Sequence, residues 1–165
     1  MKQVISSILI AVFAVATASA RIGETADQIE SRYGKPGPSV GVDVLGHQTK
    51  QYLFSGYKIT VTFQGGKSER EKYSKEDESR LLTGDISSLL AANVTNGVTW
   101  KDTVSNKWKS SDDKLVAFFV GGILDVMTND YRKAQKGADE KEQEEKADKE
   151  EEKPDKQEEK PNEPD

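Results

Sequence analysis

The stretch YKITVTFQ, residues 57–64, decides the fold of this chain because it alternates strictly between apolar and polar side chains. Successive side chains of a strand point to opposite faces, so this strand has one apolar face and one polar face. Such a strand belongs to an antiparallel sheet with one face on a core and the other toward solvent. The residues expected on the packed face are Tyr57, Ile59, Val61 and Phe63.

Tight turns flank this strand on both sides. Ser55-Gly56 precedes it and Gly65-Gly66 follows it, and glycine readily adopts the positive φ that two-residue hairpin turns need. These turns predict partner strands at about residues 48–54 and 67–73. Segment 67–73, KSEREKY, is so polar that we expect it at an edge of the sheet, where charge discourages pairing with other chains.

Two helices are expected to accompany these strands. Thr25 and Gln28 have the spacing of a capping box for a short helix that ends near Gly34. A second helix fits residues 84–93, with leucines and an isoleucine on its apolar face.

A second hairpin is expected near the end of the domain. A short strand fits around Trp108, and residues 114–120 and 123–128 flank the turn Gly121-Gly122. The core residues expected from this hairpin are Phe118, Val120, Ile123 and Val126. The element order predicts an α+β fold, an antiparallel sheet with two short helices on one face, and it is consistent with a duplicated α-β-β-β unit.

Composition divides the chain into one small α+β domain, residues 21–131, and a Lys/Glu-rich acidic tail, residues 132–165. Residues 134–165 contain seven lysines against fourteen aspartates and glutamates, a net charge of −7, and no Val, Ile, Leu or aromatic residue. The whole chain has a net charge of −5, so residues 1–133 carry +2. A segment without apolar residues cannot offset its ordering entropy by burial, so we expect a disordered or partly helical tail.

Residues 1–20 have the pattern of a secretory signal peptide. Lys2 is followed by an apolar run at residues 4–16, and Ala18 and Ala20 give the small-x-small pattern of a cleavage site. The mature chain would then begin at Arg21 in the periplasm or outside the cell, with no membrane span after cleavage. The alternative is an uncleaved anchor, although the apolar run is shorter than the roughly 20 residues that a spanning helix needs. The absence of cysteine excludes disulfides.

The sequence predicts no catalytic, cofactor-binding or metal-binding residues. His47 is the single histidine, whereas a zinc site needs three or four ligands. Residues 65–68, GGKS, resemble the end of a phosphate-binding loop, but a strand follows instead of the required helix. A catalytic serine–lysine pair is an alternative that the sequence does not exclude. Asn93-Val94-Thr95 is a glycosylation sequon. A nearly neutral domain with an acidic tail makes nucleic acid an unsuitable partner.

Four aromatic residues are the candidates for binding a partner: Tyr52, Phe54, Trp100 and Trp108. They belong either to the core or to a partly exposed aromatic patch that anchors another protein.

The opening Ile22-Gly23-Glu24-Thr25, followed by an acidic first helix and Tyr33-Gly34-Lys35-Pro36, resembles the SmpA/BamE-like small bacterial envelope proteins over about residues 22–64. These proteins and the β-lactamase inhibitor proteins share a unit in which a helix precedes an antiparallel sheet. The resemblance implies this helix-then-sheet fold, together with a non-catalytic role in protein–protein interactions of the cell envelope. The chain departs from the lipoprotein pattern because it has no cysteine to lipidate, and it adds the acidic tail.

We therefore expect an exported, non-enzymatic protein-binding or envelope-assembly module with no cofactor and with a protein of the cell envelope as partner. The alternatives are a small secreted hydrolase or hydrolase inhibitor, or a lineage-specific protein of another class. A serine-reactive probe that labels the folded protein would favour the hydrolase.

Overall fold

In the described part of the chain, one antiparallel sheet and three helices make up a mixed α+β fold. The computed structural model describes residues 22–38, 40–95 and 97–151, so the predicted signal peptide and residues 152–165 lie outside the described part. The elements are α1 (Ala26–Tyr33), β1 (Gly41–Val42), β2 (Gln48–Phe54), β3 (Tyr57–Gln64), β4 (Lys67–Lys75), α2 (Thr83–Ala92), β5 (Trp100–Val104), β6 (Lys107–Ser110), β7 (Leu115–Val120), β8 (Ile123–Thr128) and α3 (Asn129–Glu151).

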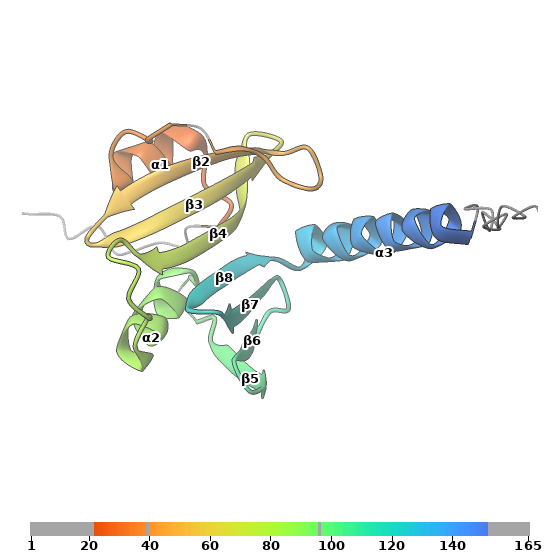
Figure 1. Cartoon of the computed structure of the whole chain (residues 1–165). Coiled ribbons are helices and arrows are strands. Elements are labelled where there is room, and N and C mark those ends of the chain that lie inside the picture. Colours follow the sequence, from red (N-terminus) through yellow and green to blue (C-terminus); the bar gives the residue numbers. More distant parts are fainter. Residues whose placement is uncertain (1–21, 39, 96, 152–165) are drawn as a thin grey trace, which may run out of the picture.

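The sheet consists of two meanders that meet at their last strands. Among the described residues it has eight strands in the order β1-β2-β3-β4-β8-β7-β6-β5 (Figure 1). β4 and β8 form the seam between the two halves, with Arg70 opposite Met127 and Tyr73 opposite Leu124. Each half is a helix followed by four strands. The fold class expected from the sequence is therefore confirmed, with one strand more in each unit than the α-β-β-β pattern predicted.

The first hairpins follow the sequence signals closely. β2 and β3 have the predicted bounds, and the turn between them places both Ser55 and Gly56 at positive φ, 52° and 76°. β1 and β5 have no counterpart among the predicted strands. β1 has only two residues and β5 is largely exposed, so neither has an alternating apolar pattern that a sequence could reveal.

β4 lies at the centre of the sheet, so the expectation that it is an edge strand is wrong. Its polar side chains have partners on both faces of the sheet. Glu71 is fully buried and accepts hydrogen bonds from the hydroxyls of Tyr33 and Tyr73. On the other face, Arg70 Nε donates to Asp125 Oδ1 of β8 over 2.8 Å. Buried polar groups are tolerated when they are hydrogen-bonded, which explains a polar strand in this position.

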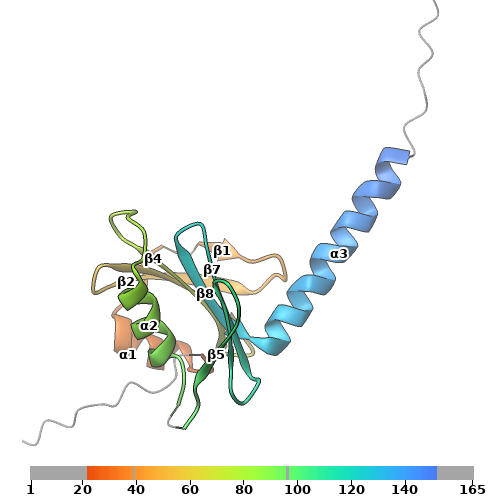
Figure 2. The same cartoon turned by 90° about the horizontal axis from the view of Figure 1, so that it is seen from below.

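The main core lies between the sheet and the helices α1 and α2, which cover the same face (Figure 2). Ile29 and Tyr33 of α1 and Leu89 and Leu90 of α2 pack there. The residues of the sheet in this core are Tyr52, Ile59, Val61, Tyr73, Ala117, Phe119, Leu124 and Val126. This arrangement confirms helices on one face of an antiparallel sheet.

The core assignment for the second hairpin is only partly correct. Val126 is fully buried, but Val120 and Ile123 are 74% and 41% exposed, and Phe118 is half-buried outside the main core. The other side chains of this hairpin that belong to the main core are those of Ala117, Phe119 and Leu124. β7 reads LVAFFV and is apolar on both faces, so alternation could not tell which residues point to the core.

Helix α3 follows β8 directly and contains the first part of the acidic segment. The Thr128 hydroxyl oxygen accepts a 3.1 Å hydrogen bond from the backbone N–H of Tyr131, as in a helix N-cap. Farther along, Lys146 pairs with Glu142 at 2.7 Å, the i,i+4 spacing that favours helix. No helix in the described ranges is both long enough and apolar enough to cross a membrane.

We predict that Val61→Asp unfolds the domain. Val61 is fully buried in the main core, so the variant places an unpaired charge there. The expected loss is at least ~3 kcal/mol of unfolding free energy. The matched control is Thr60→Asp on the opposite face of β3, which is half-buried beside Lys72 and should change stability little. Chemical denaturation of both variants tests this, and equal stability of the two would contradict the assigned faces.

Candidate binding surface

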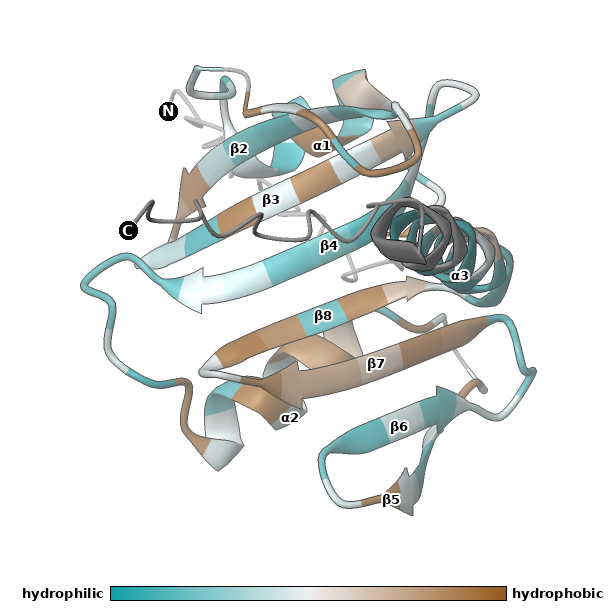
Figure 3. Cartoon of the chain, turned by 45° about the vertical axis from the view of Figure 1, so that its right-hand side comes forward, coloured by the Kyte–Doolittle hydropathy of each residue, from teal (hydrophilic) through white to brown (hydrophobic). Residues whose placement is uncertain are grey.

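The face of the sheet away from α1 and α2 is the candidate functional surface, and we call it the open face (Figure 3). The strand registers place Gln51, Thr60, Lys72, Asp125, Phe118 and Lys107 in one row across this face, from β2 to β6. A second row, nearer the β7–β8 turn, contains Leu53, Lys58 and Ser74 on one side and Ile123 and Val120 on the other. Apolar and cationic side chains therefore stand side by side.

The start of α3 covers one end of the open face. Tyr131 is buried with Val116 and Met127 in a second, smaller core, against which Leu45 and Phe118 pack. The Tyr131 hydroxyl donates a 2.5 Å hydrogen bond to Asp43 Oδ2 in the β1–β2 loop, and Asp43 Oδ1 accepts from the backbone N–H of His47. This contact fixes the origin of α3 on the sheet.

Hydrogen bonding sets the protonation of this contact. Burial alone would raise the pKa of Asp43, but hydrogen bonds from Tyr131 and from the backbone N–H groups of His47 and Leu45 outweigh it, and the pKa lies below its usual value. Burial, together with the hydrogen bond to Asp43, raises the pKa of Tyr131 to about 12. Asp43 is therefore ionised and Tyr131 protonated at neutral pH.

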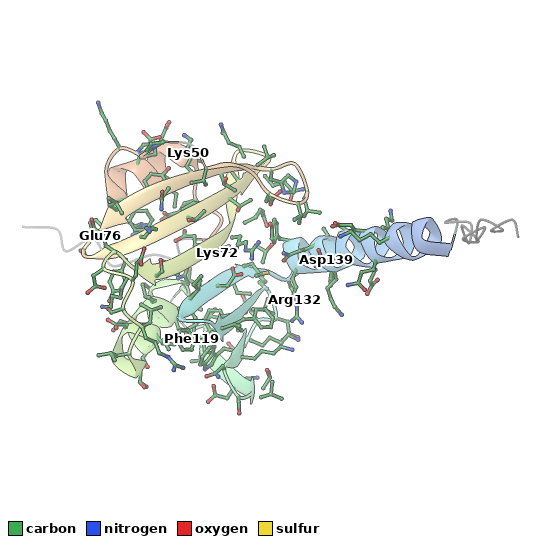
Figure 4. The ribbon with its side chains drawn as sticks, in the orientation of Figure 1. Lys50, Lys72, Glu76, Phe119, Arg132 and Asp139 are labelled. Atoms are coloured by element: carbon green, nitrogen blue, oxygen red, sulfur yellow. The ribbon has the colours of Figure 1, made fainter. Side chains whose placement is uncertain are left out.

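Beside this covered end lies a groove of about 400 Å³ between the open face and the first turns of α3. We call it the basic groove, and the residues that define it are Lys72, Phe118, Val120, Ile123, Arg132 and Lys136. Figure 4 shows Lys72 on the sheet and Arg132 at the base of α3. The side chain of Ile123 also lines a second hollow, of about 440 Å³, that contains Lys58 and Arg80.

Phe118 has two cations over its ring. Lys107 Nζ lies 5.6 Å and Arg132 Cζ lies 4.5 Å from the ring centroid, within the range of cation–π interactions. The two cations come from β6 and α3, so positively charged side chains of two different elements lie next to the Phe118 ring. The groove is thus apolar at its floor and cationic at its rim.

The four aromatic residues singled out from the sequence do not lie on the open face. Tyr52 is fully buried and lies 5.7 Å from Tyr33 between ring centroids, and Phe54 lies 5.4 Å from the same ring. Trp100 and Trp108 come together in the other half of the sheet, lining a hollow of about 390 Å³ beside α2. Trp100 Nε1 also donates a 2.7 Å hydrogen bond to the Leu90 carbonyl oxygen.

Sequence reasoning missed the groove residues because it assigned them elsewhere. Phe118, Val120 and Ile123 were expected in the core, and Lys72 on an edge strand. One signal was available: β7 is apolar on both faces. The two short predicted helices can cover only one face of a sheet, so the apolar residues on its other face must be exposed.

The residues considered for chemistry have structural partners. His47 Nδ1 lies 3.5 Å from Asp43 Oδ2. The GGKS segment forms the β3–β4 turn and the start of β4. In the part of the chain that is described, no group of three or more His, Cys, Asp or Glu residues is arranged to hold a metal ion.

The sequon asparagine is buried in the fold. Asn93 has no exposed surface, and its Nδ2 atom, which would carry a glycan, donates 2.9 Å hydrogen bonds to the Tyr73 hydroxyl and the Leu89 carbonyl. Glycosylation of Asn93 is therefore incompatible with this arrangement.

Comparisons with known proteins add no functional assignment. No family model matches the chain, and the searches of curated proteins and of solved structures returned no match.

We predict that Tyr131→Phe loosens the start of α3 and does so in a pH-dependent way. Asp43 loses a donor while it stays charged, so the expected destabilisation is ~1–3 kcal/mol at pH 7. The pKa of Asp43 is lowered in the folded state, so the ionised carboxylate stabilises the fold. This contribution to the free energy of unfolding is fully present above the ordinary carboxyl pKa, and it is lost as the pH falls through the folded-state pKa.

The difference in melting temperature between the wild type and Tyr131→Phe should therefore narrow below about pH 4. NMR titration of the Asp43 carboxyl should give a higher pKa in the variant. An unchanged pKa would contradict the role of the Tyr131 hydroxyl.

Proposed function

We propose that this chain is an exported, non-enzymatic binding protein that docks another protein on the open face of its sheet. The observation that carries the proposal is the exposure of apolar side chains on that face. Val120 is 74%, Leu53 55% and Ile123 41% exposed, although their neighbours in sequence Phe119, Tyr52 and Leu124 are buried. Exposed apolar patches with polar rims are typical of sites where proteins bind one another.

The shape of this surface favours a protein over a small molecule. The two hollows on either side of Ile123 are surface depressions: one lies on the sheet face beside α3, and the other lies at the end of the sheet, by the β7–β8 turn and the loop after β4. Small-molecule sites are enclosed enough to bury most of their ligand, whereas a broad face with lysines at its margin suits a folded or extended polypeptide.

Residues 1–20 support export, and the resemblance of residues 22–64 to envelope proteins supports a partner in the periplasm or outside the cell. In this proposal α3 acts as a spacer. Its 23 residues extend for about 34 Å and lead away from the sheet, carrying the acidic residues with them (Figure 1).

Site-specific photo-crosslinking in the native host tests the proposal. A photo-reactive amino acid replaces Val120 on the open face or, as the matched control, Leu82 at the start of α2. The two residues are both apolar and similarly exposed, at 74% and 70%. We expect a discrete adduct from position 120 and none from position 82. The absence of an adduct at 120, or the same adducts from both positions, would overturn docking on the open face.

A further inference from the structure

We propose that the partner presents an acidic segment to the basic groove, so that its carboxylates lie among Lys72, Lys107 and Arg132 while its apolar side chains contact Phe118 and Val120. This inference rests on the proposed function and names the chemistry of the partner.

Cations outnumber carboxylates on the open face, although Lys109 pairs with Asp113 and Arg70 pairs with Asp125. Along β3, β4 and β6 its side chains include Lys58, Arg70, Lys72, Lys107 and Lys109. The carboxylates near the groove are Asp125 and Asp139. Asp125 is engaged with Arg70 through two hydrogen bonds, so it does not neutralise the other cations.

Three cations in or beside the groove form no ion pair in the described part of the chain: Lys72 and Arg132 in its lining, and Lys107 over the Phe118 ring. Among the described residues, Lys72, Lys107 and Arg132 have no carboxylate within 4.0 Å. Arg70, by contrast, has its pKa raised because the hydrogen bond and charge of Asp125 outweigh its burial. The positive potential at the groove therefore comes from side chains that are available to an incoming anion.

Phe118 holds two of these cations in place. Arg132 and Lys107 both lie over its ring, which fixes their position but contributes no net negative charge. Side chains positioned before binding lose less entropy when a ligand arrives. An acidic segment can therefore bind these cations without first ordering them.

The spacing of the charges indicates an extended polypeptide. Lys72 on β4 and Lys107 on β6 lie in the same register row, three strands apart across β8 and β7. Neighbouring strands are about 4.8 Å apart, so the two positions are separated by about 14 Å, which is about four residues of extended chain. Ile123 then connects the groove to the hollow that contains Lys58, so a further cation of the open face lies in the direction of the β7–β8 turn.

We assign the acidic segment to another protein and not to the described part of α3. α3 contributes Gln135, Lys136 and Asp139 to the groove and then leaves the sheet, so its later acidic residues lead away from the cations (Figure 2). In the first two turns of α3, Arg132 and Lys136 line the groove, whereas Lys133 lies outside it and pairs with Asp130.

Charge reversal combined with crosslinking at position 120 tests the inference in the full chain. The groove variant is Lys72→Glu with Arg132→Glu. The matched control is Lys35→Glu with Lys133→Glu, two exposed lysines outside the groove that give the same change in net charge. We expect the groove variant to lose the adduct at least about tenfold while the control keeps it. An adduct that survives in the groove variant would overturn the inference that the partner is acidic, but it would leave the proposal of docking on the open face intact. The absence of an adduct from the chain without charge reversal would instead contradict the proposed function itself.

A binding measurement with a defined probe identifies the chemistry. The probe is a labelled glutamate-rich peptide with two leucines, and its counterpart has lysine in place of glutamate. Fluorescence anisotropy should show binding of the glutamate peptide alone, weakened by salt and by the groove variant.

Three outcomes would overturn the inference: no binding of the glutamate peptide, equal binding of the lysine peptide, or displacement by an oligonucleotide at lower concentration. A fourth is much tighter binding by a chain that ends at Glu151, because the chain's own last residues would then be the occupant.

Discussion

The pairing of β4 with β8 is the constraint on which the rest of the structure depends. It joins the two halves into one sheet, and it places a strand with the sequence KSEREKYSK at the centre of that sheet. This is possible because each buried polar group meets a partner: Glu71 binds the hydroxyls of Tyr33 and Tyr73 on the helix side, and Arg70 binds Asp125 on the open side. The cost of burying these groups is offset only if both sets of contacts form together. The seam therefore ties α1, through Tyr33, to the strands of the second half.

The sequence could predict the elements that depend on local signals, but not the strand pairing at this seam. The strict alternation of β3 and the glycine turns determined the first hairpins, because both are local signals. The central place of β4 could not be predicted, since it depends on Asp125, which is 55 residues away from Arg70. The orientation of β7 was hidden for another reason: all of its six residues are apolar, so either set could have formed the core. The core residues of β7 are those on the face that helices α1 and α2 cover, because the helices cover only one face of the sheet.

The candidate surface is what remains when these packing requirements are met. Ala117, Phe119 and Leu124 are used by the core, which leaves Phe118, Val120 and Ile123 on the opposite face. Trp100 and Trp108, by contrast, were attractive in sequence because tryptophan is common at interfaces, yet they lie beside α2 and Trp100 has its indole hydrogen-bonded. Residue type alone could not locate the surface, because the location depends on which face the helices leave uncovered. The placement of α3 adds cations to that face from a distant part of the chain.

The two meanders are related by an approximate twofold arrangement about the β4–β8 seam, and this has a consequence for how such a chain can diversify. A chain with a single helix-and-four-strand unit would leave its last strand as an edge, and two copies pairing through that edge would build the same sheet as a symmetric homodimer. Two identical copies must present the same chemistry on both sides of their axis. Fusion into one polypeptide removes that restriction: β4 contributes Lys72 on one side, while β7 and β8 contribute Phe118, Val120 and Ile123 on the other. The groove then combines Lys72 of the first half with the apolar residues of β7 and β8 and the cations of α3 from the second half, an asymmetric set that no symmetric dimer of this unit could provide across its own axis.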